Sequence, residues 1–385
     1  MINQFGFVSE ETFAEKMDTQ NQFLAALVEA QGGTLKPTSW ANVQALVRAG
    51  LHSKVFSIGD QLVCKKGNDD LVWDIIGIDH DTPSDSQFTH SLTLQLHDCL
   101  PDKMQFDAPE ALYYAENGLA AGTYNFTIQN YDTTYGGGKT YQFELQNAVP
   151  AGGQLAFGWS YNTQASAAKI TAYNDEGTQI EQVGVIEGSG GTSLGTTDGT
   201  STNLNHIHRV RFGSNNYAES AVRQFLNSDK AAGSVWESKT NFDRPPAWNA
   251  NTAGFMNGLD SDFLAVIGSV QKVTALNTVT DGGGSVTLDD KFFLLSRSEV
   301  YGGLENNTNE GSPYPYFSNY SDLSAAGTGN DMNRIKLRND SVQAWWLRSP
   351  GYASSGNNCV VGSNGNLTYS SVSDVYGISP ACNII

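Results

Sequence analysis

Charged residues are scarce in this chain of 385 residues. They make up 16% of the sequence, against about 25% in a typical globular protein. Only 22 residues are Lys or Arg, whereas 40 are Asp or Glu, so the formal net charge is −18. A surface that binds nucleic acid or an anionic membrane needs a basic face. We therefore expect neither partner.

Long apolar runs and paired cysteines are also missing. No stretch approaches the roughly 18 consecutive apolar residues of a membrane-spanning helix. Residues 1–10 lack a basic region followed by an apolar one, so we expect no signal peptide. The four cysteines, Cys64, Cys99, Cys359 and Cys382, form no CxxC pair. This spacing predicts buried free thiols rather than a disulfide framework or a zinc ribbon.

The abundant residues are glycine and the aromatics, with 40 Gly, 16 Tyr and 7 Trp. Together with the low charge, they are typical of turn-rich β structure. Hydrophobic periodicity predicts helices over 9–31, 40–47 and 219–228. It predicts short strands over 55–64, 71–78 and 91–97, and Thr93–Leu96 alternates as a half-buried strand should. The expected fold class is therefore α+β.

The segment from 105 to about 195 has a different pattern. Alternating strands are separated by Gly-rich turns every 10 to 15 residues or so, which predicts a β-sandwich of the immunoglobulin type. The stretch Gly188–Thr202 is rich in Gly, Ser and Thr and is predicted to be a linker. We expect 105–202 to be an inserted module with its linker. Residues 1–35 would form a docking or oligomerisation helix, and 36–104 would join 203–385 in one domain.

The last 40 residues have the most unusual composition. From Ser349 to Tyr376, Ser, Gly, Asn and Tyr supply 18 of 28 residues, and no Lys or Arg follows Arg348. These four residue types dominate antibody paratopes, because Tyr gives large contact area and Ser, Gly and Asn give adaptable hydrogen bonding. The apolar residues between them argue against a disordered tail. The composition favours a binding surface.

Other candidate sites have weaker patterns. His206 and His208 lie on one side of an extended chain, but two ligands do not define a metal site. The run 79–81, Asp-His-Asp, offers a cation ligand or an acid–base group, yet it lies in a turn after a strand. Segment 281–284 and the pair 289–290 resemble a calcium loop in composition only, because the acid spacing of an EF-hand is absent. We expect no cofactor, with a structural Ca²⁺ ion left open.

Several motifs near the C-terminus resemble those of a known family. They are the run 289–302 (DDKFFLLSRSEVYG), 314–317 (YPYF), 345–350 (WWLRSP) and 377–383 (GISPACN). In this order they are similar to the variable proteins of diversity-generating retroelements. The resemblance covers roughly 36–104 and 203–385. It implies a C-type-lectin-type domain, related to the formylglycine-generating enzyme fold, with a variable region at about 345–385.

The resemblance also implies a function. In that family a reverse transcriptase copies a template with errors at adenines, and the copy replaces the end of the gene. Phage members are tail receptor-binding proteins, often trimeric, that attach to a bacterial surface protein or glycan. Because no signal peptide is expected here, the phage version is favoured, with the protein in the virion tail or tail fibre beside other tail proteins.

The composition and the resemblance point to the same residues. The predicted contact set comprises polar and tyrosine side chains between Pro350 and Gly377: Tyr352, Ser354, Asn357, Asn358, Ser363, Asn364, Asn366, Tyr369, Ser370, Ser371, Ser373 and Tyr376. The scaffold beneath it is predicted to be apolar: Trp345, Trp346, Leu347, Val361 and Ile378. We expect a binding protein and not an enzyme.

Two alternatives stay open. One is a structural or decoration protein of a virion with fixed specificity. The other is an enzyme, either a formylglycine-type oxidase using Cys359 and Cys382 as a copper-binding pair, or a glycosidase. A glycosidase needs two carboxylates about 5 to 10 Å apart, for which Asp79, Asp81 and Glu299 are the candidates.

Overall fold

The computed structural model describes residues 39–107, 111–127, 138–158, 169–176, 178–196, 214–237, 245–278, 281–303, 308–317, 329–354 and 356–385. The predicted helix over 9–31, His206 and His208 lie outside these ranges. The described chain is α+β, with more strand than helix. No helix in these ranges is long and apolar enough to cross a membrane.

The main sheet has six strands in the order β1-β2-β3-β23-β13, with β16 also paired to β23. Their bounds are β1 Gln61–Lys66, β2 Asp69–Ile78, β3 Leu92–Leu96, β13 Ile267–Gly268, β16 Phe292–Phe293 and β23 Ala381–Ile384. All of these pairs are antiparallel. The last strand of the chain thus lies beside β3, so the domain is assembled from distant segments.

Strand β3 is buried on both faces, which corrects the prediction of a half-buried strand. Leu92, Leu94 and Leu96 join the core on one face, and Thr93 and Gln95 have no exposed surface on the other. The alternation in its sequence is real, but the polar positions face a second buried layer. The Thr93 hydroxyl, for example, donates to Asn383 of the neighbouring β23 at 2.9 Å.

Two helices precede the sheet. Helix α2 (Trp40–Arg48) begins after Ser39, whose hydroxyl accepts a hydrogen bond from the Asn42 N–H, and it packs on α5 (Ser261–Val266). Helix α3 (His52–Val55) follows at once. The predicted strand over 55–64 is therefore wrong in its first half, because Val55 ends a helix and the strand begins at Gln61.

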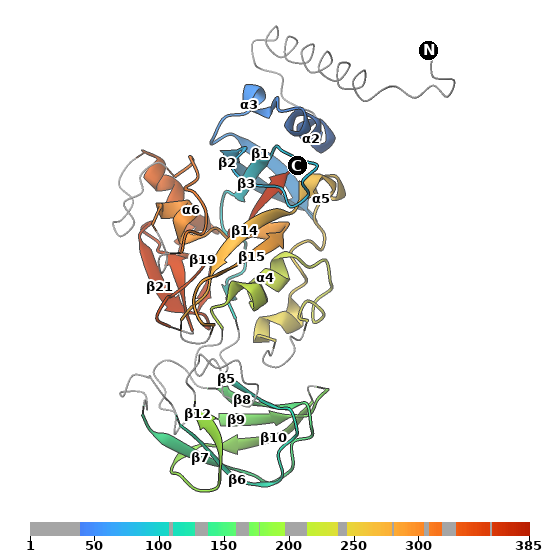
Figure 1. The fold of residues 1–385 in the computed structure, drawn as a ribbon. Helices are drawn as coiled ribbons and strands as arrows, with labels where there is room; N and C mark the ends of the chain where they lie inside the picture. The colour runs from blue at the N-terminus through green and yellow to red at the C-terminus, as the bar shows by residue number, and fades with distance from the viewer. Residues whose placement is uncertain are drawn as a thin grey trace, which may run out of the picture.

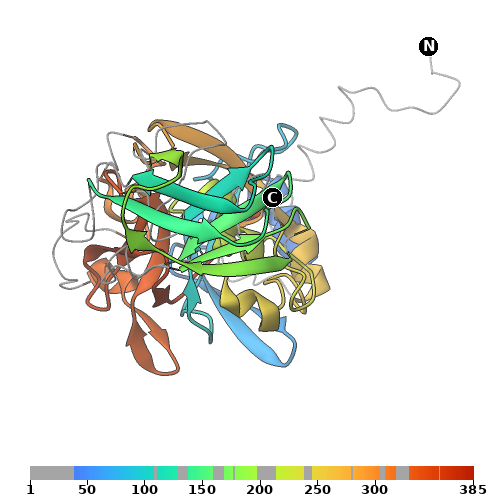
Figure 2. The same ribbon diagram turned by 90° about the horizontal axis from the view of Figure 1, so that it is seen from below.

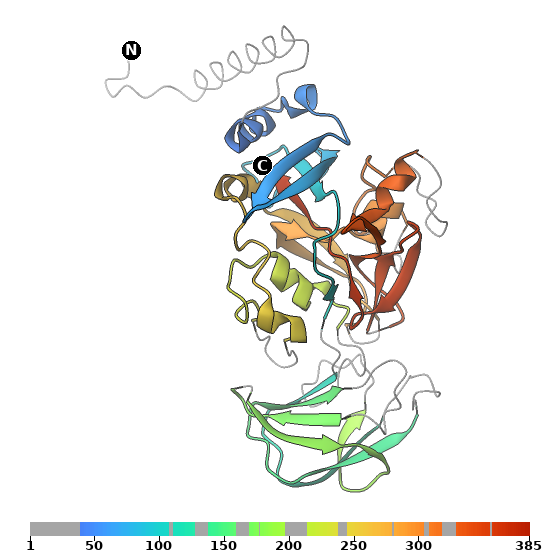
Figure 3. The ribbon, with the colours of Figure 1, turned by 180° about the vertical axis from the view of Figure 1, so that it is seen from behind.

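Residues 111–196 form a sandwich of two four-stranded sheets, ordered β10-β9-β8-β5 and β11-β7-β6-β12. The bounds are β5 Ala111–Ala115, β6 Gly122–Thr127, β7 Thr140–Leu145, β8 Gly153–Gly158, β9 Lys169–Tyr173, β10 Gln179–Gly184, β11 Ile186–Glu187 and β12 Thr192–Thr196. The sandwich lies at the opposite end of the molecule from α2 and α3 (Figures 1 and 3). Seen from that end, its green strands are nearest the viewer (Figure 2).

Part of the predicted linker belongs to this sandwich. Strand β12, inside Gly188–Thr202, pairs in parallel with β6, and Leu194 is buried in the sandwich core. A Gly/Ser/Thr-rich composition is typical of flexible linkers. Here the burial of Leu194 and the pairing of β12 with β6 place this part of the segment in a strand.

The remaining strands and helices of the main domain lie outside the six-stranded sheet. The strands are β4 Met104–Gln105, β14 Val270–Ala275, β15 Ser285–Asp290, β17 Lys336–Arg338, β18 Ser341–Gln343, β19 Trp345–Pro350, β20 Asn357–Val361, β21 Leu367–Ser371 and β22 Val375–Tyr376. The helices are η3 Tyr217–Glu219, α4 Ala221–Leu226, η4 Ala247–Asn251, α6 Arg297–Tyr301 and η5 Gly329–Arg334. Strand β19 lies along β14, which connects the C-terminal sheet to the main body (Figure 1).

Buried residues gather in three clusters. One lies between α2, α4, α5 and the main sheet, and a second fills the sandwich. A third lies between β14, α6 and the C-terminal sheet β19-β20-β21. No buried residue of the sandwich cluster belongs to the other two, so the sandwich has its own hydrophobic core.

Candidate ligand-binding surface

The predicted contact residues lie on the C-terminal sheet and its turns. Strand β20 is the central strand, paired antiparallel with β19 on one side and β21 on the other. A turn of residues 351–356 joins β19 to β20, and a turn of residues 362–366 joins β20 to β21. Most surface candidates therefore lie on two turns and the edge strand β21, while Asn357 and Asn358 lie on β20 and Tyr376 lies on β22 (Val375–Tyr376), which pairs with β4.

The predicted scaffold residues are buried in this sheet or, for Ile378, beside it. Trp345, Trp346, Leu347, Val361 and Ile378 all have 0% exposed surface. The indole N–H of Trp345 donates to the Arg334 carbonyl, and that of Trp346 donates to the Met104 carbonyl, each at 2.9 Å. Both rings are therefore fixed in orientation as well as buried.

A buried ionic network holds β19 to α6 and β14. The Arg348 guanidinium contacts both carboxylate oxygens of Glu299, at 2.6 and 3.1 Å. Lys272 of β14 lies 3.0 Å from Glu299 and 2.5 Å from Asp81. Burial alone would raise the pKa of Glu299, but the charges of Arg348 and Lys272 outweigh burial and lower it. The carboxylate is therefore a fixed anion of the scaffold.

Glu299 also shapes the start of α6. Its side chain accepts a hydrogen bond from the Ser296 N–H while the Ser296 hydroxyl accepts one from the Glu299 N–H, which is a capping box. The motifs 289–302 and 345–350 thus meet in space. Glu299 and Arg348, which join the two motifs, are buried and therefore structural.

The first turn, residues 351–356, is held by hydrogen bonds from the protein interior, whereas its tip is exposed. Tyr352 at its tip is 43% exposed. The Asn215 side-chain amide donates to the carbonyls of Gly351, Ser354 and Asn357, and the Ser354 hydroxyl accepts from the Asn357 N–H at 3.0 Å. Asn215 is a functional candidate that sequence reasoning missed, since it lies 136 residues from Gly351. It fixes the shape of the turn that presents Tyr352.

The second turn exposes Ser363 and Asn364, with Asn366 half-buried. Gly365 has a φ of 78°, a left-handed conformation that favours glycine. Its carbonyl accepts a hydrogen bond from the Tyr301 hydroxyl at 3.0 Å. This turn is therefore also tied to the buried scaffold.

Strand β21 presents two further exposed residues. Tyr369 is 44% exposed, and Thr368 beside it is also exposed although it was absent from the predicted set. Tyr376 has a different environment: its ring packs on Trp346 at 5.0 Å and its hydroxyl hydrogen-bonds to that of Ser370 at 2.8 Å. Tyr376 is thus both a half-buried packing residue and a surface residue.

Two members of the predicted contact set are corrected by the structure. Asn358 has no exposed surface, and its amide donates to the Leu347 carbonyl at 2.6 Å. Ser371 is 8% exposed, and its hydroxyl hydrogen-bonds to that of Ser373. Both belong to strands covered by neighbouring layers, so a polar residue type did not indicate exposure. Asn357, Ser354, Ser370 and Ser373 are half-buried.

The exposed members do not form one compact patch. The turns 351–356 and 362–366 lie at opposite ends of the five-residue strand β20, which is itself about 13 Å long at 3.3 Å per residue. Strand β21, with Tyr369 near its middle, runs between them at the edge of the sheet. The candidate surface is thus an elongated strip along this edge, which we call the β21 strip: Tyr352, Ser363, Asn364, Thr368 and Tyr369. Thr368 and Tyr369 project to opposite sides of β21, because successive side chains of a strand alternate.

The other sequence candidates do not assemble with this strip. Asp81 and Glu299 are both bound to the Lys272 ammonium inside the protein. Asp290 pairs with Arg223, and Asp289 accepts a hydrogen bond from Ser84. The carboxylates proposed for calcium thus have protein partners.

All four cysteines are buried, and none forms a disulfide. Burial raises the pKa of Cys64 to about 11 and that of Cys99 to about 12, so these thiols stay protonated at neutral pH. Cys359 and Cys382 lie in different core clusters, on β20 and β23.

Separately, a cleft of about 600 Å³ lies between the main sheet and the loop after η4. Its lining includes Leu71, Leu100, Met104, Phe225 and Phe255. No member of the predicted contact set lines it. Sequence reasoning missed it, because its walls come from segments that are far apart in the chain.

Comparison with known proteins adds a family. A family model described as a domain of unknown function (DUF6273) matches residues 191–385. The chain belongs to this family. The DUF6273 segment contains the whole C-terminal sheet and the ionic network except Asp81, but β1, β2 and β3 of the main sheet precede it. No curated protein and no solved structure matches the chain.

Proposed function

We propose that this protein is a non-enzymatic ligand-binding protein and that the β21 strip is its contact surface. The observation that carries the proposal is a contrast within one short segment. Trp345, Trp346 and Arg348 have no exposed surface, whereas Tyr352 and Tyr369 are more than 40% exposed. A rigid base with exposed tyrosines and short polar side chains is the arrangement of a paratope.

The buried residues beneath the β21 strip explain how its side chains could be substituted without loss of the fold. The stability of this buried base comes from side chains that point into two core clusters and from the Arg348–Glu299 pair. Surface substitutions away from packed or hydrogen-bonded positions usually change stability by no more than about 0.5 kcal/mol. Different side chains at the strip could therefore alter specificity while the buried base keeps the fold. Asn364 has a local structural role as well, because its side chain accepts a hydrogen bond from the Asn366 N–H at 3.3 Å.

The resemblance to retroelement variable proteins supports a more specific proposal. In this more specific proposal, the domain has the C-type-lectin-type fold, and the codons of the β21 strip are diversified. The protein is then a phage tail receptor-binding protein that attaches to a bacterial surface protein or glycan. The net charge of −18 disfavours nucleic acid and anionic membranes as ligands. Oligomerisation, with a trimer favoured, would add avidity to a modest single-site affinity.

Deep sequencing of the last 40 or so codons in a natural population tests diversification without knowledge of the ligand. We expect substitutions to concentrate at the exposed positions Tyr352, Ser363, Asn364 and Tyr369. The codons of the buried Trp345–Arg348 run should be constant. If the exposed codons are equally constant, diversification is wrong, and a virion protein of fixed specificity becomes the better account.

A further inference from the structure

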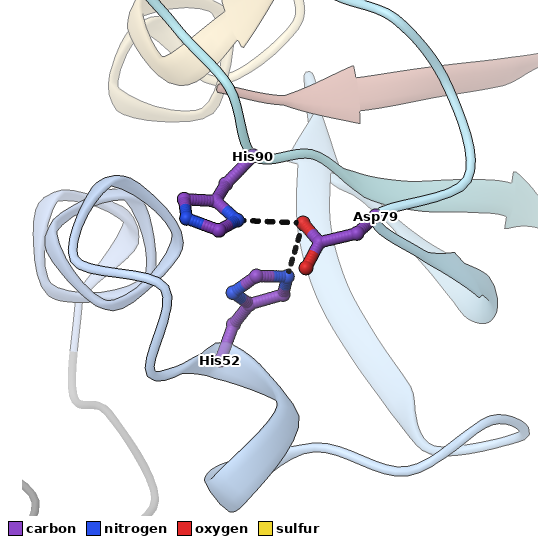
Figure 4. A group of neighbouring side chains, drawn as sticks. All are labelled: His52, Asp79 and His90. Atoms are coloured by element: carbon purple, nitrogen blue, oxygen red, sulfur yellow. Dashed lines mark hydrogen bonds and ion pairs between the residues drawn. The ribbon is translucent and has the colours of Figure 1, made fainter.

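Two histidines and one aspartate meet where α3 approaches the ends of β2 and β3 (Figure 4). His52 is the first residue of α3, Asp79 directly follows β2, and His90 lies just before β3. Nε2 of His52 lies 3.1 Å from Oδ1 of Asp79, and Nδ1 of His90 lies 3.0 Å from the same oxygen. One ligand atom from each residue lies within 4.8 Å of the others.

These distances suit a single metal ion. Zn²⁺ binds imidazole nitrogen and carboxylate oxygen at about 2.0 to 2.2 Å, so tetrahedral ligand atoms are roughly 3.3 to 3.6 Å apart. The two nitrogen–oxygen distances here are slightly shorter, and small side-chain rotations would open them. The donors are also the correct types, because imidazole and carboxylate together suit first-row divalent metals.

The surroundings of His52 point to a ligand. The residue has no exposed surface, and its ring nitrogens make only poorly oriented contacts, with the Asp79 carboxylate and the Ser91 backbone. Buried polar atoms are normally well satisfied, so these weak contacts leave a metal ion as the better partner.

The other two residues are held in place by their neighbours. Asp79 has a φ of 51°, in the left-handed region, and its Oδ1 accepts a hydrogen bond from the Ser91 N–H at 3.2 Å. A Cβ atom at residue 50 would lie 2.8 Å from Nε2 of His90. Because Gly50 has no Cβ atom, its backbone can pack against that edge of the His90 ring. The opposite edge, with Nδ1, is directed at Asp79. Such supporting contacts are typical of metal ligands.

The cluster is open on one side. The side chains of Asp79 and His90 are 42% and 36% exposed, whereas His52 closes the site from below. Three protein ligands and an open position are characteristic of zinc sites that keep a water molecule or take an external ligand. A bound ion would also connect α3 to the β2–β3 connection.

We propose that His52, Asp79 and His90 bind one divalent transition-metal ion, for which Zn²⁺ is the best match, with water at the open position. The site is separate from the β21 strip, since none of its residues lies in the C-terminal sheet. The metal proposal therefore does not depend on the proposed binding function.

Isothermal titration of ZnCl₂ into the tag-free, chelator-treated full chain tests the site. We expect one ion per chain and a rise in melting temperature on binding. His90→Ala removes an exposed ligand. Asp79→Asn keeps the shape of the side chain and tolerates the left-handed backbone. Because even supporting residues are worth 10- to 100-fold in metal affinity, each variant should bind Zn²⁺ about a hundredfold more weakly or worse.

His97→Ala is the matched control, since His97 is another half-exposed histidine paired with an aspartate, Asp74, outside the cluster. It should bind Zn²⁺ as the wild type does. The proposal is overturned if the wild type binds no stoichiometric Zn²⁺, or if Asp79→Asn and His90→Ala bind as tightly as His97→Ala.

A second measurement needs no variant. X-ray absorption of the zinc-loaded wild type should show two imidazole nitrogens with the remaining ligands oxygen. Sulfur in the coordination sphere would assign the ion to the cysteines and overturn the proposal.

Discussion

Arg348 and Glu299 form a two-pronged ion pair in the interior, with nitrogen–oxygen distances of 2.6 and 3.1 Å. Arg348 comes from β19, directly under the proposed binding surface, and Glu299 comes from the first turn of α6. The guanidinium also donates to the carbonyls of Val273, Leu294 and Glu310. The pair thus fixes the C-terminal sheet to three other segments of the chain.

Arg348→Met should strongly destabilise the protein. The substitution keeps an unbranched side chain but leaves Glu299 as a buried anion with one cation fewer, and breaking one side of a buried pair costs about 3 to 5 kcal/mol. Urea unfolding followed by fluorescence measures the loss. Adding Glu299→Gln to Arg348→Met should recover part of it, because the uncompensated charge is then gone. Equal stability of the wild type and Arg348→Met would contradict the structural role.

Glu310 should make stability depend on pH. Burial raises its pKa to about 7 from an ordinary value of 4.5. Its two oxygens accept hydrogen bonds from the Ser349 hydroxyl and the Ala275 N–H. When Glu310 is protonated, the cations Lys272 and Arg348 face two carboxylates, Asp81 and Glu299, and the network is neutral.

The sign follows from comparing the two states. Below pH 4.5 the carboxyl is protonated both folded and unfolded, so it costs nothing. Between pH 4.5 and 7 it ionises in the unfolded chain first, which favours unfolding by up to about 3 kcal/mol above pH 7. Glu310→Gln should remove this loss. We expect it to match the wild type at pH 4 and to be more stable at pH 8, and the reverse order would refute the assignment.

Tyr369→Ala and Tyr376→Ala should behave differently. Tyr369 is 44% exposed, so its removal should weaken ligand binding and leave the melting temperature nearly unchanged. Tyr376 packs on Trp346 and bonds to Ser370, so its removal should also cost about 1 to 3 kcal/mol of stability. Thermal unfolding of both variants gives the comparison. A large destabilisation by Tyr369→Ala would place that ring in the core and remove it from the proposed surface.

The sandwich should be dispensable for folding of the main domain. The Ser214 N–H donates to the Asp107 carboxylate at 3.0 Å, and both residues are buried, so the two ends of the insert lie side by side. The sandwich also has its own core. Replacing 108–213 by a short Gly/Ser linker should leave a chain that unfolds cooperatively and keeps near-ultraviolet circular dichroism from Trp345 and Trp346. A molten product would mean that the sandwich supports the main domain.

The sequence determined those features that depend on short-range pattern. Period-two alternation located β3 and four strands of the sandwich, β6 to β9, because side chains of a strand alternate between faces. The dense apolar run at Trp345–Leu347 correctly indicated burial. Composition identified 349–376 as unusual, and the tips of its turns are exposed as a polar composition favours.

Tertiary structure decided which polar side chains are available. Asn358 and Asn364 have the same chemistry, but β20 lies between two strands and two core clusters, whereas the 362–366 turn has no layer above it among the described residues. The tertiary structure also brought together His52, Asp79 and His90, which are separated by 27 and 11 residues in the sequence. No local period reports such contacts, since they depend on how distant segments pack after their strands have paired.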